Sequence, residues 1–288
     1  MTKTYQAAII IPHYNDVDRL KTCLDALGPV PDAVELVVVD NNSTDSLSSI
    51  RRAYPQLRII IETQKGAAMA RNTGVAETTA PRLFFLDSDC VPSSGWIGTA
   101  LGIADQADII GGHIDVFDET SPPRTGVQAF ETIFAFDNEG YISQKGFSVT
   151  ANILTRRDVF MATGAFRTGV SEDLDWCHRA RAKGFRLIYS PKLKVSHPSR
   201  SDWAALVRKW RRLTQEAFGV NGSSRTARLK WAMRAALMPA SILAHLPKIL
   251  RSKRISGPRD RLVAASTLIR LRFLRMVWML RQAAGGDL

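Results

Sequence analysis

The 288 residues are enough for one large domain or for a domain with an appendage, and a composition of 45% hydrophobic and 23% charged residues is typical of a globular protein. The three cysteines are far apart and form no CxxC pair, which argues against a disulfide framework and against a zinc site. The first apolar run is too short for a signal peptide core or a membrane span, so a reducing cytoplasm is the compartment that we expect.

The net charge of +12 is unevenly distributed along the chain. From residue 199 to the end there are 19 Lys/Arg and 4 Asp/Glu, whereas residues 1–198 hold 20 and 23. A slightly acidic body therefore carries a strongly basic C-terminal third. Such an asymmetry indicates an anionic partner, either a membrane surface or nucleic acid.

Apolar runs and helical patterns alternate over the first hundred residues. The sequence predicts strands at 7–11, 35–40, 57–61 and 83–86, and helices at about 20–27, 47–54 and 66–74. The strands are apolar at consecutive positions, which is typical of a parallel sheet covered by helices on both faces. Ligands of such sheets bind at the carboxyl ends of the strands.

Polar side chains follow three of these predicted strands. They are the tetrapeptide 12–15, Asp40, and the pair Asp87 and Asp89. Carboxylates two residues apart on an extended chain point to the same side, where they suit a hard divalent cation. A surface turn is the alternative. No glycine-rich loop follows the first strand, so neither a dinucleotide fingerprint nor a Walker loop is present.

The middle of the chain is less regular. Residues 109–114 predict another strand, with close backbone approach at Gly111 and Gly112. Residues 118–148 look like a long irregular connection rich in aromatic residues, which in a compact domain is often a functional loop. A helix is expected to begin near Glu172, and its acidic first turn would be stabilised by the helix dipole.

The basic third contains three apolar segments. A helix from about residue 203 to 217 has one apolar stripe surrounded by Lys and Arg. Residues 232–250 contain two prolines and Arg234, which argues against a stable membrane span. Residues 262–280 form an amphipathic pattern with an arginine-free stripe, typical of a helix in the membrane interface. A helical bundle with a solvated basic face is the alternative.

In order and spacing, seven short motifs resemble the family-two inverting glycosyltransferases of the GT-A fold. These motifs are residues 11–15, 37–45, 70–74, 86–89, 150–152, 164–166 and 172–175. The resemblance covers roughly residues 7–198. It implies an α/β catalytic domain over 1–198, with a mostly parallel sheet, a nucleotide-binding half at about 1–110 and an acceptor half at about 111–198. Residues 199–288 would be a basic helical extension.

The resemblance also implies roles for individual residues. Asp173 would be the catalytic base, Asp89 would bind Mn²⁺ or Mg²⁺, and His197 would be a further metal ligand. Asp40 would accept a hydrogen bond from uracil, which favours a UDP-sugar, although Asp40 could instead cap the next helix. The nucleotide-sugar would be bound by Pro12, Tyr14, Asn15, Asp40, Lys65, Arg71, Asp87, Ser88, Asn152 and Glu172.

These expectations combine into one functional hypothesis. The chain would be a metal-dependent inverting glycosyltransferase of the hexosyltransferase type, adding one sugar to a lipid-linked glycan or envelope polysaccharide. A single transfer is expected because the Gln-x-x-Arg-Trp signature of processive enzymes is absent. The extension would hold the enzyme at the inner face of the cell membrane, and no nucleic-acid partner is expected because no nucleic-acid module is present.

Two other classes remain open at this stage. A sugar-nucleotide pyrophosphorylase would also use a nucleotide-binding α/β sheet, but it would want a glycine-rich loop where this chain has residues 12–15. A non-catalytic adaptor that binds membranes or nucleic acid would have no use for Asp87, Asp89 and Asp173.

Overall fold

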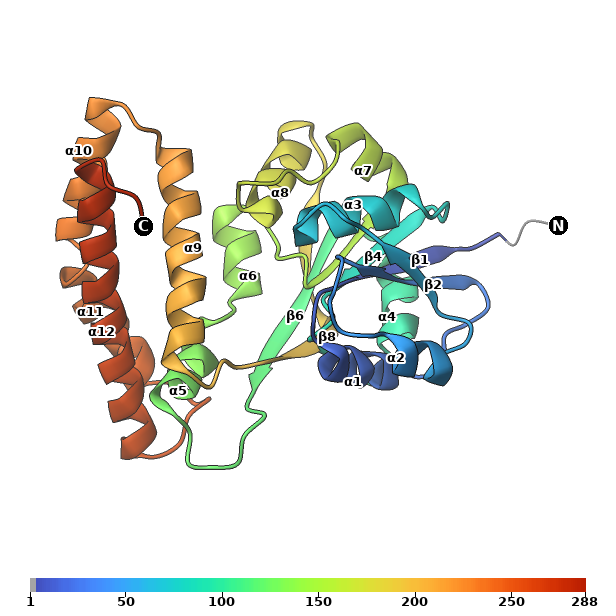
Figure 1. The fold of residues 1–288 in the computed structure, drawn as a ribbon, viewed down its shortest axis with the longest axis horizontal. Coiled ribbons are helices and arrows are strands. Elements are labelled where there is room, and N and C mark those ends of the chain that lie inside the picture. Colours follow the sequence, from blue (N-terminus) through green and yellow to red (C-terminus); the bar gives the residue numbers. More distant parts are fainter. Residues whose placement is uncertain (1–3) are drawn as a thin grey trace. The chain divides into compact units, whose positions relative to one another are not determined.

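Eight strands form one sheet in the computed structural model, which describes residues 4–288. Their order across the sheet is β3-β2-β1-β4-β7-β6-β8-β5 (Figure 1). The first four strands in the chain lie parallel, as their apolar runs predicted. They are β1 (Ala7–His13), β2 (Val34–Asp40), β3 (Arg58–Ile61) and β4 (Arg82–Leu86).

Helices cover both faces of this sheet. One face packs against α3, α7 and α8, and the other lies over α1, α2 and α4 (Figure 1). The small residues of α3 have a clear purpose: a Cβ on Gly74 would clash with the Ile10 side chain of β1. These helices are α1 (Val17–Leu27), α2 (Ser48–Ala53), α3 (Ala67–Ala76), α4 (Trp96–Ile103), α7 (Arg157–Thr163) and α8 (Glu172–Ala182).

The other half of the sheet contains antiparallel pairs, which the sequence analysis did not anticipate. β7 (Asn152–Arg156) runs antiparallel to both β4 and β6 (Ile109–Phe117). The short β5 (Val91–Pro92) pairs in the same way with β8 (Leu187–Pro198). The predicted close approach at the glycine pair is confirmed, because a Cβ on Gly112 would clash with the side-chain amide of Asn152.

The prediction that residues 118–148 are irregular is wrong. They contain α5 (Gly126–Phe134), α6 (Asn138–Gly140) and a π-helical turn at Tyr141–Lys145. A capping box begins α5, in which Thr125 accepts from the Gln128 backbone and Gln128 accepts from the Thr125 backbone. The Thr-x-x-Gln spacing was therefore a helix signal within the apparent loop.

By its internal contacts the chain divides into two compact units. The sheet unit holds residues up to 115, 137–168 and 172–197, and the helical unit holds 116–136, 169–171 and 198–288. The helical unit thus includes α5, which the sequence analysis placed in the catalytic domain. The reason is that the apolar face of α5 packs against the long helix α12. The separation of 1–198 from 199–288 as functional domains stays a prediction.

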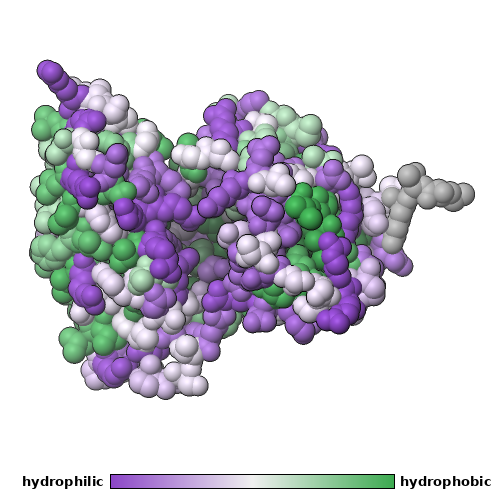
Figure 2. Space-filling model, in the orientation of Figure 1, coloured by the Kyte–Doolittle hydropathy of each residue, from purple (hydrophilic) through white to green (hydrophobic). Residues whose placement is uncertain are grey.

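Four helices make up the rest of the helical unit. Its core contains Leu206, Ile249, Leu268 and Leu271. Figure 2 shows hydrophobic residues on the surface of α10, α11 and α12, among hydrophilic ones. In residues 4–288 no helix is long and apolar enough to cross a membrane. The four helices are α9 (Trp203–Asn221), α10 (Arg225–Ala236), α11 (Ala240–Leu250) and α12 (Pro258–Ala283).

A buried carboxylate lies inside the helical unit. The side chain of Glu131, in α5, is 1% exposed and lies between two cations. Its Oε1 is 3.1 Å from Arg200 Nη1 and 2.9 Å from Lys209 Nζ. Burial raises the pKa of Glu131, but Lys209 and Arg200 outweigh burial and lower it overall. We call these three residues the Glu131 triad.

Candidate functional site

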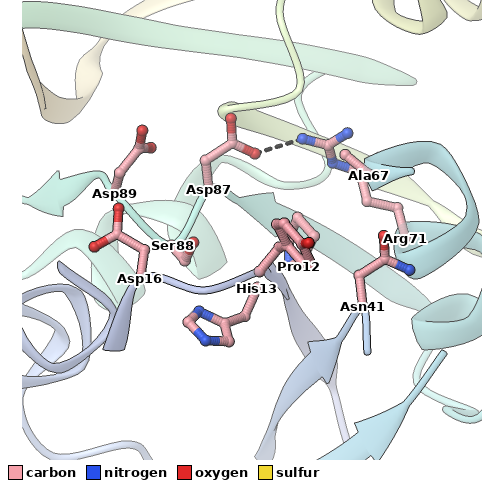
Figure 3. Close-up of a pocket in the computed structure, with 10 residues that line it drawn as sticks. Pro12, His13, Asp16, Asn41, Ala67, Arg71, Asp87, Ser88 and Asp89 are labelled. Atoms are coloured by element: carbon pink, nitrogen blue, oxygen red, sulfur yellow. Dashed lines mark hydrogen bonds and ion pairs between the residues drawn. The ribbon is translucent and has the colours of Figure 1, made fainter. Parts of the chain in front are cut away.

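A cavity of about 250 Å³ opens where β1, β2 and β4 end at their carboxyl edge. It brings together six of the positions that the resemblance assigned to the donor or the metal. These are Pro12, Tyr14, Arg71, Asp87, Ser88 and Asp89 (Figure 3). Segments separated by up to about seventy residues meet here because parallel strands place their carboxyl ends at one edge of the sheet.

Arg71 connects this cavity to helix α8. Its side chain is 4% exposed, and Nη2 lies 2.5 Å from Asp87 Oδ1 (Figure 3). Nη1 lies 2.8 Å from Glu172 Oε1. Burial acts against the charge, but Asp87, Glu172 and Asp173 outweigh it and raise the pKa of Arg71, so the guanidinium stays charged. The carboxylates of Asp87 and Glu172 are 29% and 28% exposed, so they still face solvent. We call these three residues the Arg71 triad.

Asp173 lies beside the Arg71 triad, at the start of α8. Its Oδ1 accepts hydrogen bonds from Thr150 Oγ1 at 2.8 Å and from the Thr150 backbone N–H at 3.2 Å. Burial raises the pKa of Asp173 to about 6, with Glu172 and Asp87 raising it further and Arg71 and Thr150 opposing them. The residue as a whole is only partly buried. Among the described residues only Thr150 hydrogen bonds to it, which leaves Oδ2 able to accept a proton.

Asp89 and His197 form the part of the site that suits a metal. Pairing of Val91 with Ser196 brings β5 and β8 together and places Asp89 Oδ2 3.2 Å from His197 Nε2. Within residues 4–288 no cluster of three or more His, Cys, Asp or Glu side chains could hold a metal ion. A carboxylate oxygen and an imidazole nitrogen nevertheless fit Mn²⁺, and two protein ligands leave positions for oxygens of a bound diphosphate.

Three other predicted donor residues lie near the cavity but do not line it. Asp40 Oδ1 accepts from Ser43 Oγ at 2.5 Å and from the Ser43 N–H at 3.2 Å, so this oxygen holds the turn after β2. Asn15 Oδ1 accepts from the Thr44 N–H at 2.8 Å. Lys65 is exposed in the loop before α3. Asp40 and Asn15 therefore shape the cavity wall.

The structure does not bring Asn152 to the cavity. Its side chain is fully buried in β7 and makes three hydrogen bonds. Oδ1 accepts from Trp96 Nε1, and Nδ2 donates to the backbone oxygens of His113 and Leu193. The two bonds from Nδ2 join β7 to β6 and β8. The Asn152 side chain therefore holds the sheet together.

Four residues that line the cavity were not predicted. They are His13, Asp16, Asn41 and Ala67. Asn41 donates to the backbone oxygens of Glu62 and Gln64 and accepts from the Gly66 N–H, so it holds the loop before α3. The position of Asn41, directly after the strand-end Asp40, was the signal that could have found it.

His13 is unusual among the lining residues. It is 1% exposed, and neither ring nitrogen has a hydrogen-bond partner among the residues that the structure describes. Burial lowers the pKa of His13, although Asp40, Asp16 and Asp45 oppose that change. His13 therefore adds a buried imidazole to the lining of the cavity.

Residues 8–173 match the family model described as Glycosyl transferase family 2. Glycosyltransferase AglE of Haloferax volcanii is 30% identical over 226 residues, which are 73% of this chain and 73% of AglE. The chain spans less than half the length of several other curated relatives.

Two solved structures are similar over nearly the whole chain. The mannosyltransferase PcManGT from Pyrobaculum calidifontis, in complex with GDP-Man and Mn²⁺, has a TM-score of 0.54 and 20% identity, and the match covers 100% of this chain and 77% of PcManGT. TarS 1–349 of S. aureus, in complex with UDP-GlcNAc, has a TM-score of 0.53 and 15% identity, covering 91% of this chain and 71% of TarS. At these identities the likeness concerns the fold.

Proposed function

The chain belongs to glycosyl transferase family 2, and from that premise we propose that it is an inverting, metal-dependent enzyme that moves one sugar from a nucleotide-sugar to an acceptor hydroxyl. That the chain is a glycosyltransferase of the GT-A fold confirms what its motif order predicted. The proposal adds the stereochemistry, the metal, the donor and the acceptor.

The observation that carries the mechanism is the link made by Arg71. It fixes Asp87, at the nucleotide end of the site, to Glu172, which is adjacent in sequence to Asp173. The proposed base is thereby held beside the donor cavity. An inverting transfer needs a carboxylate that accepts the acceptor's hydroxyl proton as the oxygen attacks the sugar carbon opposite the departing diphosphate.

In this proposal Thr150 holds Asp173 Oδ1, and Oδ2 takes the proton. Asp89 and His197 would hold the divalent cation, which would supply positive charge next to the diphosphate. Arg71 keeps Asp87 oriented toward the nucleotide. Tyr14 is 54% exposed at the rim of the cavity, where its ring could lie against the donor.

For the donor base we favour uracil. Asp40 Oδ1 holds the turn after β2, and the second oxygen of this carboxylate could accept from the imide N–H of uracil. The two similar structures contain different nucleotides, GDP-Man and UDP-GlcNAc, so the fold alone does not select a base. A thermal-shift screen of UDP-, GDP- and dTDP-sugars with Mn²⁺ should give its largest shift with a uridine or thymidine donor. A preference for GDP would contradict the role of Asp40.

For the acceptor we propose a hydroxyl of a lipid-linked glycan or an envelope polysaccharide, used by an enzyme that rests on the inner face of the membrane. The support is the basic C-terminal third, with 19 Lys/Arg against 4 Asp/Glu. Membrane extracts fractionated by lipid solubility, supplied with radiolabelled donor, would show whether label enters a lipid-linked product.

The substitution Asp173→Asn tests the mechanism. It keeps the side-chain shape but removes the proton acceptor, so turnover should fall by about 10²–10⁴-fold while donor affinity, measured by calorimetry with Mn²⁺, stays near wild type. The matched control is Asp175→Asn in the same helical turn. Asp175 pairs with Arg179 at 2.8 Å and has no part in the proposed proton transfer, so its loss should leave turnover near wild type. Near-normal turnover of Asp173→Asn would remove Asp173 from the mechanism.

A further inference from the structure

Exposed hydrophobic side chains are concentrated in the helical unit. Of the fourteen large hydrophobic residues that are exposed within residues 4–288, eleven lie between Val220 and Leu280. The longest series lies on α12, where Leu262, Ile269, Phe273, Val277 and Leu280 are 41–72% exposed. Their spacing of three, four and seven residues puts them on one face, about 27 Å long from Leu262 to Leu280. A monomeric protein rarely exposes such a surface without a partner.

Two of the helices that pack on α12, α10 and α11, repeat this pattern. On α10, Leu229 and Met233 are 64% and 60% exposed, and Leu237 follows at its end. On α11, Leu243 is 75% exposed and Leu250 57%. Both helices contact α12 through other residues, so these side chains are left over from the packing of the unit.

Cations lie among these side chains. Lys230 and Arg234 are exposed on α10, and Arg251, Lys253 and Arg254 are exposed immediately after α11. The whole C-terminal third has the same excess of positive charge, because Lys and Arg greatly outnumber Asp and Glu there. A protein partner for an apolar face would need acidic residues placed to match each cation, whereas anionic lipid offers phosphates everywhere beside hydrocarbon.

Two arginines of α12 lie away from its exposed stripe. Arg270 stacks over the Trp203 ring at 4.2 Å, and Arg275 over the Trp210 ring at 4.5 Å, both on α9. The sequence alone left open a lipid-facing helix or a packed bundle. The structure combines them, because α12 is packed on one side and carries an arginine-free apolar stripe on the other.

We propose that the exposed faces of α10, α11 and α12 dock on the surface of an anionic lipid bilayer. Leu262, Phe273 and Val277 enter the level of the headgroups and upper acyl chains, and the cations after α11 bind lipid phosphates. Docking is at the surface, since no helix among residues 4–288 could cross the bilayer. The proposal stands independently of the sugar that the enzyme transfers.

Flotation of the full chain with vesicles tests the docking. Wild type should float with vesicles that contain about a third phosphatidylglycerol and much less with pure phosphatidylcholine, and high salt should weaken binding. The combined substitution Leu262→Ser, Phe273→Ser and Val277→Ser should reduce the partition coefficient by about tenfold or more. The control is Ile61→Ser with Met161→Ser, which removes side chains that are 60% and 67% exposed in the sheet unit, and it should bind like wild type.

A second measurement is independent of these variants. The three native cysteines are buried, so Leu243→Cys can be labelled selectively with an environment-sensitive fluorophore. Its emission should shift to the blue with anionic vesicles and remain unchanged with RNA. Equal flotation of the triple variant and wild type would overturn the proposal. So would a blue shift that occurs without lipid as protein concentration rises, because a second copy would then cover the face.

Discussion

The Arg71 triad of the sheet unit and the Glu131 triad of the helical unit are the same device with the charges reversed. In each, one buried charge lies between two charges of opposite sign. They differ in what the two outer charged groups of each triad contact. Both carboxylates of the Arg71 triad are partly exposed, and one of them, Asp87, lines the cavity at the strand ends. Both cations of the Glu131 triad end on Glu131 itself.

We infer that this difference separates an ion network that serves the site from one that serves only the fold. A buried charge is strongly destabilised unless it is paired, so both triads are required by their surroundings. In the Arg71 triad, the buried cation orients two carboxylates that are still partly exposed to solvent. In the Glu131 triad, the buried carboxylate holds α5 to α9 and to the segment before α9, and both cations pair with that carboxylate. The two should therefore fail in different ways.

The largest effect is expected from Arg71→Met. Without the guanidinium, Asp87 and Glu172 lose their orientation, and turnover should fall by about 10²-fold or more. Unfolding free energy should fall by only about 1–3 kcal/mol, because both carboxylates keep contact with water. Steady-state kinetics and urea unfolding measure the two effects.

The control for this change is Arg58→Met. Arg58 also joins two carboxylates, Glu35 at 2.8 Å and Glu77 at 2.8 Å, but it is 43% exposed and lies outside the donor cavity. It should cost about 1 kcal/mol or less and leave turnover unchanged. If both arginine variants lost the same activity, the Arg71 triad would have no special place in the reaction.

Glu131→Gln should give the opposite result. It keeps the shape of the side chain but leaves Lys209 and Arg200 without their carboxylate in a buried position, which should cost about 3 kcal/mol of unfolding free energy. Donor binding with Mn²⁺ should be unchanged, since every residue of the donor cavity lies in the sheet unit.

Glu119→Gln is the matched control in the helical unit, because Glu119 is exposed. It should alter stability by less than about 0.5 kcal/mol. A Glu131→Gln protein that unfolded like wild type would show that the buried pairs contribute nothing to stability. That result would contradict the structural role of the Glu131 triad.

How far these features were visible in the sequence depends on the kind of interaction. The strand ends carrying Asp87 and Asp89 were predictable because apolar runs and their terminating residues are local signals. The pairing of Arg71 with Asp87 and Glu172 was not, since it joins residues 16 and 101 positions apart. The antiparallel pairing of β7 with β4 and β6 was also hidden, because it joins segments that are far apart in the sequence.

Asn152 shows the same limit from the other side. The residue matches a family position, yet its side chain fills the space left by the missing Cβ of Gly112 and bonds with three groups of neighbouring segments. Only the tertiary structure reveals that partnership. The helix at 126–134 was a different case, because the Thr125–Gln128 capping box was local and could have been read.

The smallest effect concerns pH and refines the Arg71 triad. Burial raises the pKa of Asp173 to about 6, against an ordinary value near 4, while Arg71 opposes the change and Glu172 and Asp87 add to it. A base must be ionised to act, so kcat/KM should fall about tenfold for each pH unit below about 6 and level off above it. The same shift lowers stability as pH rises from about 4 to 6, because the folded state holds this proton more tightly than the unfolded chain does.

In Arg71→Lys, which keeps the charge but not the planar guanidinium, the acidic limb of the profile should stay close to pH 6. In Arg71→Met the limb should move to higher pH, since the cation that opposes the rise in the pKa of Asp173 is gone. A pH–rate profile over pH 4.5–8 would measure both, and an acidic limb at the same pH in wild type and Arg71→Met would show that the group titrating in the profile is not the carboxylate beside Arg71.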